Sequence, residues 1–317
     1  MDRMQQIVVR RLFLSQVRVL VIGEEAARKN MRETVRFLER SNEVRRSAAV
    51  LITPGRAEDV LATTGQRTLV AAEGIRLLLD RTEQTGVAFN TSLRENILLP
   101  LAINGIEPIA SRVIATQDSS GGKAGSSAAP MPEDQGSQGL VKQKQGVIRV
   151  SGMAAFKGNE LVGWLNEKES RGWGWIMGRV RRGYTATLDS TDSHGESEQV
   201  TFHLLKGKSK VKTTVEDGQA AVNVTVKVRG EVVEWSAGTK RIDPAAIRKL
   251  EAGLAENIKS EMESALSKAQ WELESDIFGF GFQFSRQHRR EWNREFKDRW
   301  EELFPSVRLR SRSRPKS

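Results

Sequence analysis

The stretch GMAAFKGNELVGWLNEKESRG, residues 152–172, gives the clearest succession of local structures in the chain. A strand predicted at Val147–Phe156 leads into the turn residues Gly158-Asn159, and a second apolar run returns at Leu161–Leu165. Two apolar runs joined by such a short turn predict a β-hairpin. A short helix is then predicted over 166–176, with its first residue, an asparagine, as the N-cap.

Further strands are predicted downstream of this hairpin and helix. Valine occupies every second position of Val222–Val228 and polar residues stand between. This period of two is typical of a strand with one dry and one wet face. Shorter strands are predicted at Tyr184–Leu188 and Gln199–Leu205.

Two helices are predicted near the end of the chain. Asp243 and Pro244 suit the N-cap and first position of a long helix, whose apolar stripe continues to Ile277 over about nine turns. A second helix is predicted over Ser285–Leu303, followed by a last edge strand around 307–310. The aromatic and histidine stripe of this second helix recurs every four residues and consists of Phe284, His288, Trp292, Phe296, Trp300 and Phe304.

The first 115 residues alternate between apolar runs and helical periodicity. The predicted strands and helices are, in order, Val17–Ile22, Glu24–Arg40, Ser47–Thr53, Ala57–Ala62, Leu69–Arg81 and Ile106–Ala115. This order favours an α/β unit.

The sequence therefore predicts a mixed α/β, or α+β, protein with two units. Residues 1–115 form the first unit, 116–146 a flexible linker dense in Gly, Ser, Ala, Gln and Pro, and 147–317 the second unit. In the second unit we expect a mostly antiparallel sheet packed by the long helix and the aromatic-rich helix. A length of 317 residues agrees with two domains.

Composition excludes several classes of chemistry. The chain has no cysteine, which rules out disulfides, thiolate catalysis, cysteine-bound zinc and thioether lipid anchors. It also has no run of about 18 apolar residues that could span a bilayer. The formal net charge is +10, and five basic residues lie in the last thirteen positions without an acid. Such a tail can bind an anionic membrane surface or nucleic acid, although a solvated end is the simpler interpretation.

Catalytic motifs are weak or absent. Ser120 and Lys123 match S-x-x-K but fall in the predicted linker, and Gly207-Lys208-Ser209 lacks the earlier glycine of a phosphate-binding loop. Histidines are not spaced as metal ligands, and His288 fits a packed position on its helix. We therefore predict no catalytic residue, cofactor or metal.

Two rival functions stay open at this point. Glu167 and Glu169 are the nearest candidates for the paired carboxylates of a glycan hydrolase, although acids at a helix start usually interact with its dipole. The segment HRREWNREFKDRW, residues 288–300, superficially resembles a nucleic-acid-binding surface. On a helix its aromatic residues share one stripe and most basic residues lie off it, which is typical of a core helix, so nucleic acid is not expected.

Candidate interaction residues come from two features. Trp164, Trp173 and Trp175 are more tryptophans than the hairpin and helix need for packing, and tryptophan is enriched at interface anchors. Core burial is the alternative for each. The basic tail adds a second set of candidates, namely Arg308, Arg310, Arg312 and Arg314.

Several segments together resemble the Ger(x)C family of spore germination lipoproteins. The segments are Gly152–Lys157, Leu161–Asn166 and Glu169–Gly172, then KAQWELESDIFGFG at 268–281, Trp292, Trp300 and Glu302–Pro305, with LFLSQVRVLVIGEEAA at 12–27, Arg40 and GRAEDVL at 55–61 near the start. They cover most of the chain outside the linker and occur in the order of the family.

The resemblance implies a non-catalytic C subunit of a nutrient germinant receptor, with mixed α/β domains. Its expected partners are two membrane-embedded receptor subunits, contacted at the outer face of the spore inner membrane. Members of the family begin with a signal peptide and a lipidated cysteine. We expect this chain to be truncated at its N-terminus relative to them, with no site for lipidation.

Overall fold

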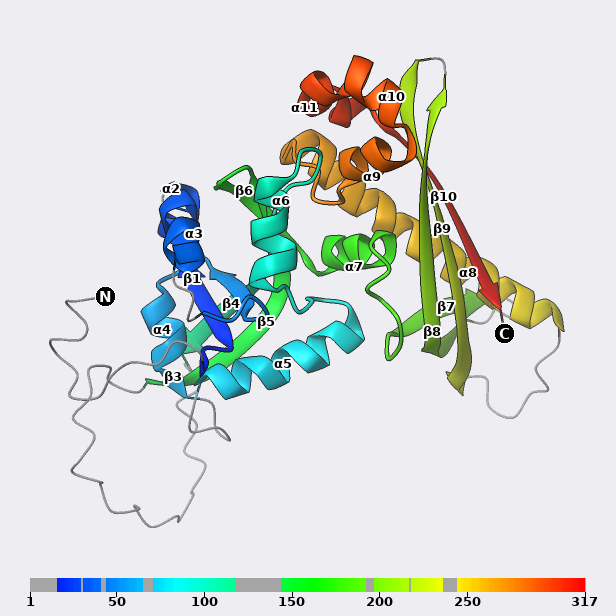
Figure 1. Cartoon of the computed structure of the whole chain (residues 1–317). Coiled ribbons are helices and arrows are strands. Elements are labelled where there is room, and N and C mark those ends of the chain that lie inside the picture. The colour runs from blue at the N-terminus through cyan, green and yellow to red at the C-terminus, as the bar shows by residue number, and fades with distance from the viewer. Residues whose placement is uncertain are drawn as a thin grey trace, which may run out of the picture.

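A computed structural model describes residues 16–29, 31–40, 44–64, 71–117, 144–191, 197–216, 218–235 and 244–316. Two β-sheets lie at opposite ends of the molecule, and helices pack around and between them (Figure 1). Both sheets combine with helices, so the predicted α+β class is confirmed. No helix within the described residues is long and apolar enough to cross a bilayer.

The first sheet has six strands and is mixed. They are β1 (Val19–Gly23), β2 (Ala49–Thr53), β3 (Thr63–Thr64), β4 (Ile109–Gln117), β5 (Lys144–Lys157) and β6 (Glu160–Leu165). β1, β2 and β4 run parallel, β5 is antiparallel to β4 and to β6, and β3 is parallel to β5. All five residues of β2 are buried, as expected for a central parallel strand covered on both faces.

Helices cover both faces of this sheet. They are α2 (Glu24–Lys29), α3 (Met31–Arg40), α4 (Ala57–Ala62), α5 (Ala71–Thr85), the π-helix η2 (Leu93–Leu98) and α6 (Leu99–Ala102). Residues of α2, α3 and η2 share one apolar cluster with one face, while residues of α4 and α5 pack on the other. The segment Leu93–Ala102 was not predicted from the sequence.

The predicted division of the chain does not coincide with the division between sheets. β5 and β6 were expected to begin the second unit, but β5 pairs with β4 and with β3, so the hairpin completes the first sheet. Most of the predicted linker lies outside the described residues. Strands from both predicted units therefore share one hydrogen-bonded sheet.

The second sheet confirms the expectation of a mostly antiparallel arrangement. Its order is β10 (Arg308–Lys316), β9 (Gln219–Trp235), β8 (Ser197–Glu216) and β7 (Thr185–Thr191), and only β10 is parallel to its neighbour. The long helix α8 (Pro244–Ser267) runs along one face of it (Figure 1). The alternating valines of β9 are buried on that face.

The long helix ends earlier than its apolar stripe predicted. α8 passes into the π-helix η3 (Lys268–Glu272), and Glu274 then adopts a positive φ of 47°. The Asp276 carboxylate accepts hydrogen bonds from the backbone N–H groups of Phe280 and Gly281 at 3.0 and 2.8 Å. These bonds fix the start of the next helix and separate Ile277 from the long helix.

The aromatic-rich segment is several short helical pieces, so the single helix predicted over Ser285–Leu303 is wrong in its continuity. The pieces are α9 (Phe280–Gln287), α10 (Arg289–Glu291), η4 (Trp292–Phe296), η5 (Lys297–Arg299), α11 (Trp300–Leu303) and η6 (Phe304–Ser306). A spacing of four residues drifts by about 40° per step around an ideal α-helix. The breaks and the π turn offset this drift, and the five aromatic residues of the stripe remain buried.

The short helix α7 (Glu167–Ile176) lies between the two sheets and contacts β5 and β6 in one and β8 and β9 in the other. Asn166 is its N-cap, as predicted, and forms a capping box with Glu169. The helix packs against α8 at Gly172, where an added Cβ would lie only 1.9 Å from the backbone oxygen of Glu261. Glycine is therefore required at this crossing.

Substitution Gly172→Ala is expected to lower the free energy of unfolding by at least about 2 kcal/mol, because the two helices cannot approach as closely. Gly253→Ala on α8 is the matched control, since nothing lies within 4 Å of its added Cβ. The control is expected to raise stability by about 0.5–1 kcal/mol through helix propensity. Urea unfolding of both variants measures the difference, and equal stabilities would contradict the close packing.

Candidate functional site

Two of the three tryptophans predicted as interaction residues lie in the core. Trp173 is 2% exposed and its indole N–H donates to the carbonyl of Ile277 at 2.9 Å. Trp175 is 1% exposed and donates to the Glu261 carboxylate at 2.8 Å. Neither side chain offers a surface to a partner in this structure, so core burial, the alternative considered above, describes both.

A buried charge network surrounds these tryptophans. The Glu261 carboxylate is almost fully buried and also accepts a hydrogen bond from Arg171 Nε at 2.7 Å. Burial by itself lowers the pKa of Arg171, but the facing Glu261 outweighs it and raises the pKa above the usual value. Tyr184 packs edge-on against Trp175, and burial raises the pKa of its phenol. The network joins α7 to α8 and is structural in character.

The third predicted tryptophan, Trp164 on β6, is only partly buried. It packs against the apolar cluster of the first sheet, and the guanidinium carbon of Arg112 lies 5.8 Å from its ring centroid. Arg112 also donates from Nε to the carbonyl of Ser151 at 2.8 Å, and burial lowers its pKa. Trp164 thus combines a packing role with some exposed surface.

The predicted basic tail is a strand. Arg308 and Arg310 on β10 are exposed, and Arg310 forms an ion pair with Glu216 at 2.8 Å. In the backbone register Arg312 pairs with Thr225 and Arg314 with Lys227, whose side chain is exposed. The arginines therefore belong to an ordered sheet edge that adjoins further lysines.

An exposed tryptophan was missed in the sequence. Trp271, in η3 at the end of α8, is 69% exposed, the largest exposed fraction among the large apolar side chains that the structure describes. Its neighbour Gln270 is buried and donates to the carbonyls of Phe304 and Val307. Trp271 lies between Ala269 and Leu273 in the sequence but does not fall on the apolar stripe to which they belong. Its position off the stripe could have predicted that its side chain is exposed.

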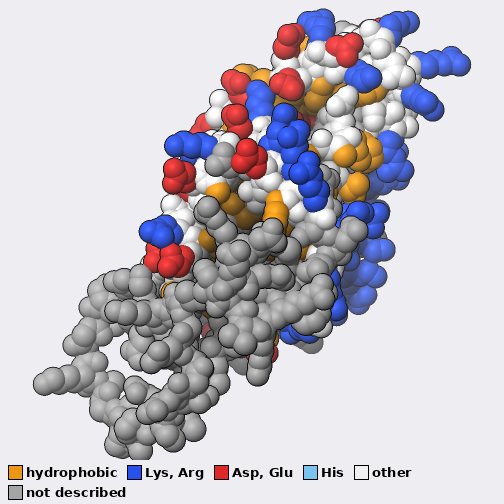
Figure 2. Space-filling model, turned by 60° about the vertical axis from the view of Figure 1, so that its left-hand side comes forward, with side chains coloured by type: hydrophobic (Ala, Val, Ile, Leu, Met, Phe, Trp, Pro, Cys, Tyr) orange, Lys and Arg blue, Asp and Glu red, His pale blue; other side chains and the backbone are white. Residues whose placement is uncertain are grey.

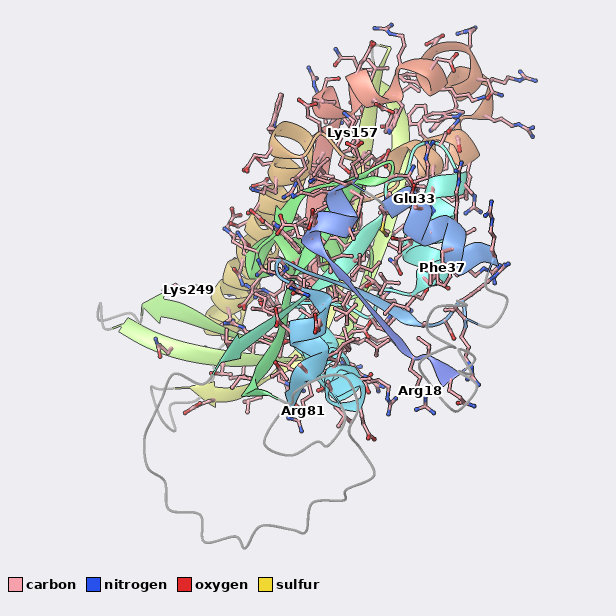
Figure 3. The ribbon with its side chains drawn as sticks, turned by 90° about the vertical axis from the view of Figure 1, so that its left-hand side faces the viewer. Arg18, Glu33, Phe37, Arg81, Lys157 and Lys249 are labelled. Atoms are coloured by element: carbon pink, nitrogen blue, oxygen red, sulfur yellow. The ribbon has the colours of Figure 1, made fainter. Side chains whose placement is uncertain are left out.

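Other exposed apolar side chains are scattered. Phe37 on α3 is half exposed and lies on the opposite side of the molecule from Lys249 near the start of α8 (Figure 3). On the face seen in Figure 2, apolar side chains form small separate patches, and Lys and Arg gather along one edge. Charge is thus distributed more unevenly than apolar surface on this face.

A polar cavity of about 520 Å³ lies where the loop after α6 meets the β5–β6 turn and the C-terminal helices. Its carboxylates come from distant parts of the chain and include Glu107, Glu274, Asp276, Asp298, Glu301 and Glu302. Lys157, which is labelled in Figure 3 at the end of β5, forms ion pairs with Glu274 and Glu301 at 3.7 and 3.9 Å.

Two carboxyl groups of this cavity have raised pKa values. Burial raises the pKa of Glu107 to about 7, although the N–H of Gly158 donates to its carboxylate at 2.6 Å. Burial likewise raises the pKa of Asp276 to about 6, although hydrogen-bond donors that include the indole of Trp300 at 2.9 Å act to lower it. Backbone bonds from Glu107 N to Asp276 O and from Phe282 N to Gly105 O hold the loop against this segment.

The residues considered for catalysis or metal binding have structural partners. Glu169 belongs to the capping box, and Glu167 accepts from Ser151 Oγ at 2.6 Å and from Arg149 at 2.5 Å, which lower its pKa. A lowered pKa is opposite to what a general acid needs. His288 donates from Nε2 to the carbonyl of Thr213 at 2.8 Å. Within the described ranges, no group of three or more histidines and carboxylates could hold a metal ion.

Substitution Glu107→Gln is expected to stabilise the protein at pH 8 by on the order of 1 kcal/mol and to change little at pH 4. The pKa of Glu107 is higher when folded than when unfolded, so its contribution is fully present below about pH 4.5 and is lost as the pH rises through about 7. The variant should therefore lose the part of the pH dependence that lies between about pH 4.5 and pH 7.

Urea unfolding at intervals between pH 4 and pH 8 measures this effect. Glu33→Gln, at an exposed position on α3, is the control and is expected to follow the wild-type profile. If the free energy of unfolding of Glu107→Gln and of the wild type changed with pH in the same way, the raised pKa of the buried Glu107 would be contradicted.

Comparison with known proteins assigns most of the chain. Residues 1–112 match the family model described as spore germination protein N-terminal domain. Residues 151–312 match the model described as spore germination B3/GerAC like, C-terminal.

Curated relatives agree with these matches. Spore germination protein B3 of Bacillus subtilis (strain 168) is 24% identical over 92% of this chain and 70% of its own length. Spore germination protein GerQC of Bacillus cereus is 24% identical over 94% of this chain and 73% of its own. The crystal structure of the GerBC protein superposes with a TM-score of 0.67 at 19% identity, over 95% of this chain and 78% of that one, and confirms the fold. The chain therefore belongs to the Ger(x)C family of spore germination proteins.

Proposed function

We propose that this protein is a non-catalytic subunit of a nutrient germinant receptor and acts in spore germination through contacts with other polypeptides. The observation that carries the proposal is the match of both family models, which together cover residues 1–112 and 151–312. The relatives named above are spore germination proteins by title. The partners proposed are the two membrane-embedded subunits, at the outer face of the spore inner membrane.

The chemistry of the described residues supports a binding role. Glu167 and Glu169, the candidates for catalysis, are held in an ion pair and a helix cap, and His288, which was considered as a metal ligand, donates to a backbone carbonyl. The carboxyl groups of the polar cavity lie around Lys157 and backbone donors. A glycan hydrolase would need an acid and a carboxylate facing a common substrate.

Trp271 is the residue that we assign to partner contact. Its 69% exposed side chain lies on a segment whose neighbours are fixed by the buried Gln270 and by the packing of Leu273 against Gly163. A large aromatic side chain on a rigid segment loses little conformational entropy when it is covered, and tryptophan is a frequent hot spot.

Substitution Trp271→Ala is expected to lower the amount of the two membrane-embedded subunits that co-purify with this chain at least tenfold, with thermal unfolding unchanged. A hot-spot residue contributes about 2 kcal/mol, which corresponds to about a 30-fold change in affinity. Val233→Ala, at a 62% exposed position on β9, is the matched control and should leave the complex intact.

Affinity capture from detergent extracts of cells that co-express the three chains gives the measurement. Co-purification of the Trp271→Ala chain at wild-type level would remove Trp271 from the interface. Failure of the wild-type chain to capture either subunit would contradict the proposed function itself.

A further inference from the structure

The second sheet carries a basic array on the face that α8 does not cover. Lysines occupy alternate positions of β8. The basic residues of β9 and β10 occupy positions that face the same side of the sheet. The exposed basic side chains of this face, called here the basic sheet face, are Lys206, Lys208, Lys210, Lys212, Lys227, Arg229, Arg308 and Arg310. The alternate residues point inward, where Val222, Val224, Val226 and Val228 share one apolar cluster with residues of α8.

The strand register brings these charges together. Lys208 of β8 is directly opposite Lys227 of β9, and Lys206 is opposite Arg229. On the other side of β9, the backbone of Arg310 is opposite Asn223, which is itself opposite Lys212. Directly opposite residues lie on the same face of a sheet. Three adjacent strands therefore form one two-dimensional array of cations.

Among the residues that the structure describes, almost all of this charge has no acidic partner. Glu216 pairs with Arg310 at 2.8 Å, and no other acid forms an ion pair with this face within the part of the chain that the structure describes. Like charges directly across a ladder, such as Lys208 and Lys227, destabilise a sheet. A ligand of opposite charge would offset this repulsion.

We propose that the basic sheet face docks on an anionic phospholipid surface. The positions follow strands about 4.8 Å apart with about 6.7 Å between outward residues, so the charge is spread over an area. A membrane surface presents anionic headgroups over an area in the same way. The outward positions between the cations are Asn223, Thr214 and Thr225, with no aromatic side chain on which the bases of a nucleic-acid strand could stack.

This inference goes beyond the proposed function, because it concerns this chain and lipid alone. It also changes the interpretation of the basic tail. The arginines of β10 are not a separate binding end but the edge of an array that includes lysines of β8 and β9, far earlier in the chain.

Co-sedimentation of the purified chain with lipid vesicles tests the proposal. Vesicles of phosphatidylcholine with 30% phosphatidylglycerol are expected to bind the chain at 0.1 M salt and to release most of it at 0.5 M salt. Vesicles of phosphatidylcholine alone should not bind it, because the attraction is electrostatic and is screened by salt.

Two quadruple variants with the same net charge separate the face from overall charge. The first changes Lys208, Lys210, Lys212 and Lys227 to glutamine and is expected to weaken vesicle binding at least tenfold. The second changes Arg36, Arg94, Arg289 and Arg290, exposed positions outside this sheet, to glutamine and should bind within threefold of the wild type. Circular dichroism and thermal unfolding verify that both variants fold.

Three results would overturn the proposal. They are the absence of wild-type binding to anionic vesicles, an equal loss in both variants, and tighter binding of duplex DNA than of anionic vesicles at equal salt. Capture of the membrane-embedded subunits is measured in detergent, so failure of the vesicle assay leaves the test of the proposed function intact.

Discussion

The crossing of α7 over α8 is the constraint on which the rest of the structure depends. The almost fully buried Glu261 accepts hydrogen bonds from Arg171 and Trp175, and Gly172 lets the two helix backbones meet beside it. A buried carboxylate is costly unless its oxygens are satisfied, so the arrangement has little freedom to shift. Because α7 contacts strands of both sheets, this one crossing fixes how the two sheets are placed.

The residues that carry the family resemblance have structural roles at and around this crossing. The residues that carry the resemblance are mainly glycines, caps and buried side chains. Asn166 caps α7, Gly172 permits its packing, and Asp276 fixes the turn into α9 while it accepts from Trp300. These roles are architectural, and the surfaces that suit partners, Trp271 and the basic sheet face, lie on the outside of that architecture. A scaffold of this kind agrees with a subunit that works by contact.

Local features of the sequence predicted local structure well. The hairpin at 147–165 and the cap at Asn166 depend on neighbouring residues, and both were predicted. The sheet that this hairpin joins depends on pairing between β4 and β5 across the intervening chain, which no local pattern reveals. The burial of Trp173 and Trp175 likewise depends on distant parts of the chain, because Trp175 contacts Glu261 of α8 and Trp173 contacts Ile277 in the turn before α9, 86 and 104 residues away. The basic sheet face was hidden because its three strands are brought together only by the fold, although each strand shows the alternation.

A double-mutant cycle on Arg171 and Glu261 tests the central claim most directly. Each single change to methionine leaves the remaining charge buried without its partner, and each is expected to cost about 3–5 kcal/mol in urea unfolding. The double variant should cost less than the sum of the two by more than about 1 kcal/mol. Single variants that each cost under about 1 kcal/mol and add within about 0.5 kcal/mol would contradict the claim that this buried crossing holds the two sheets in place.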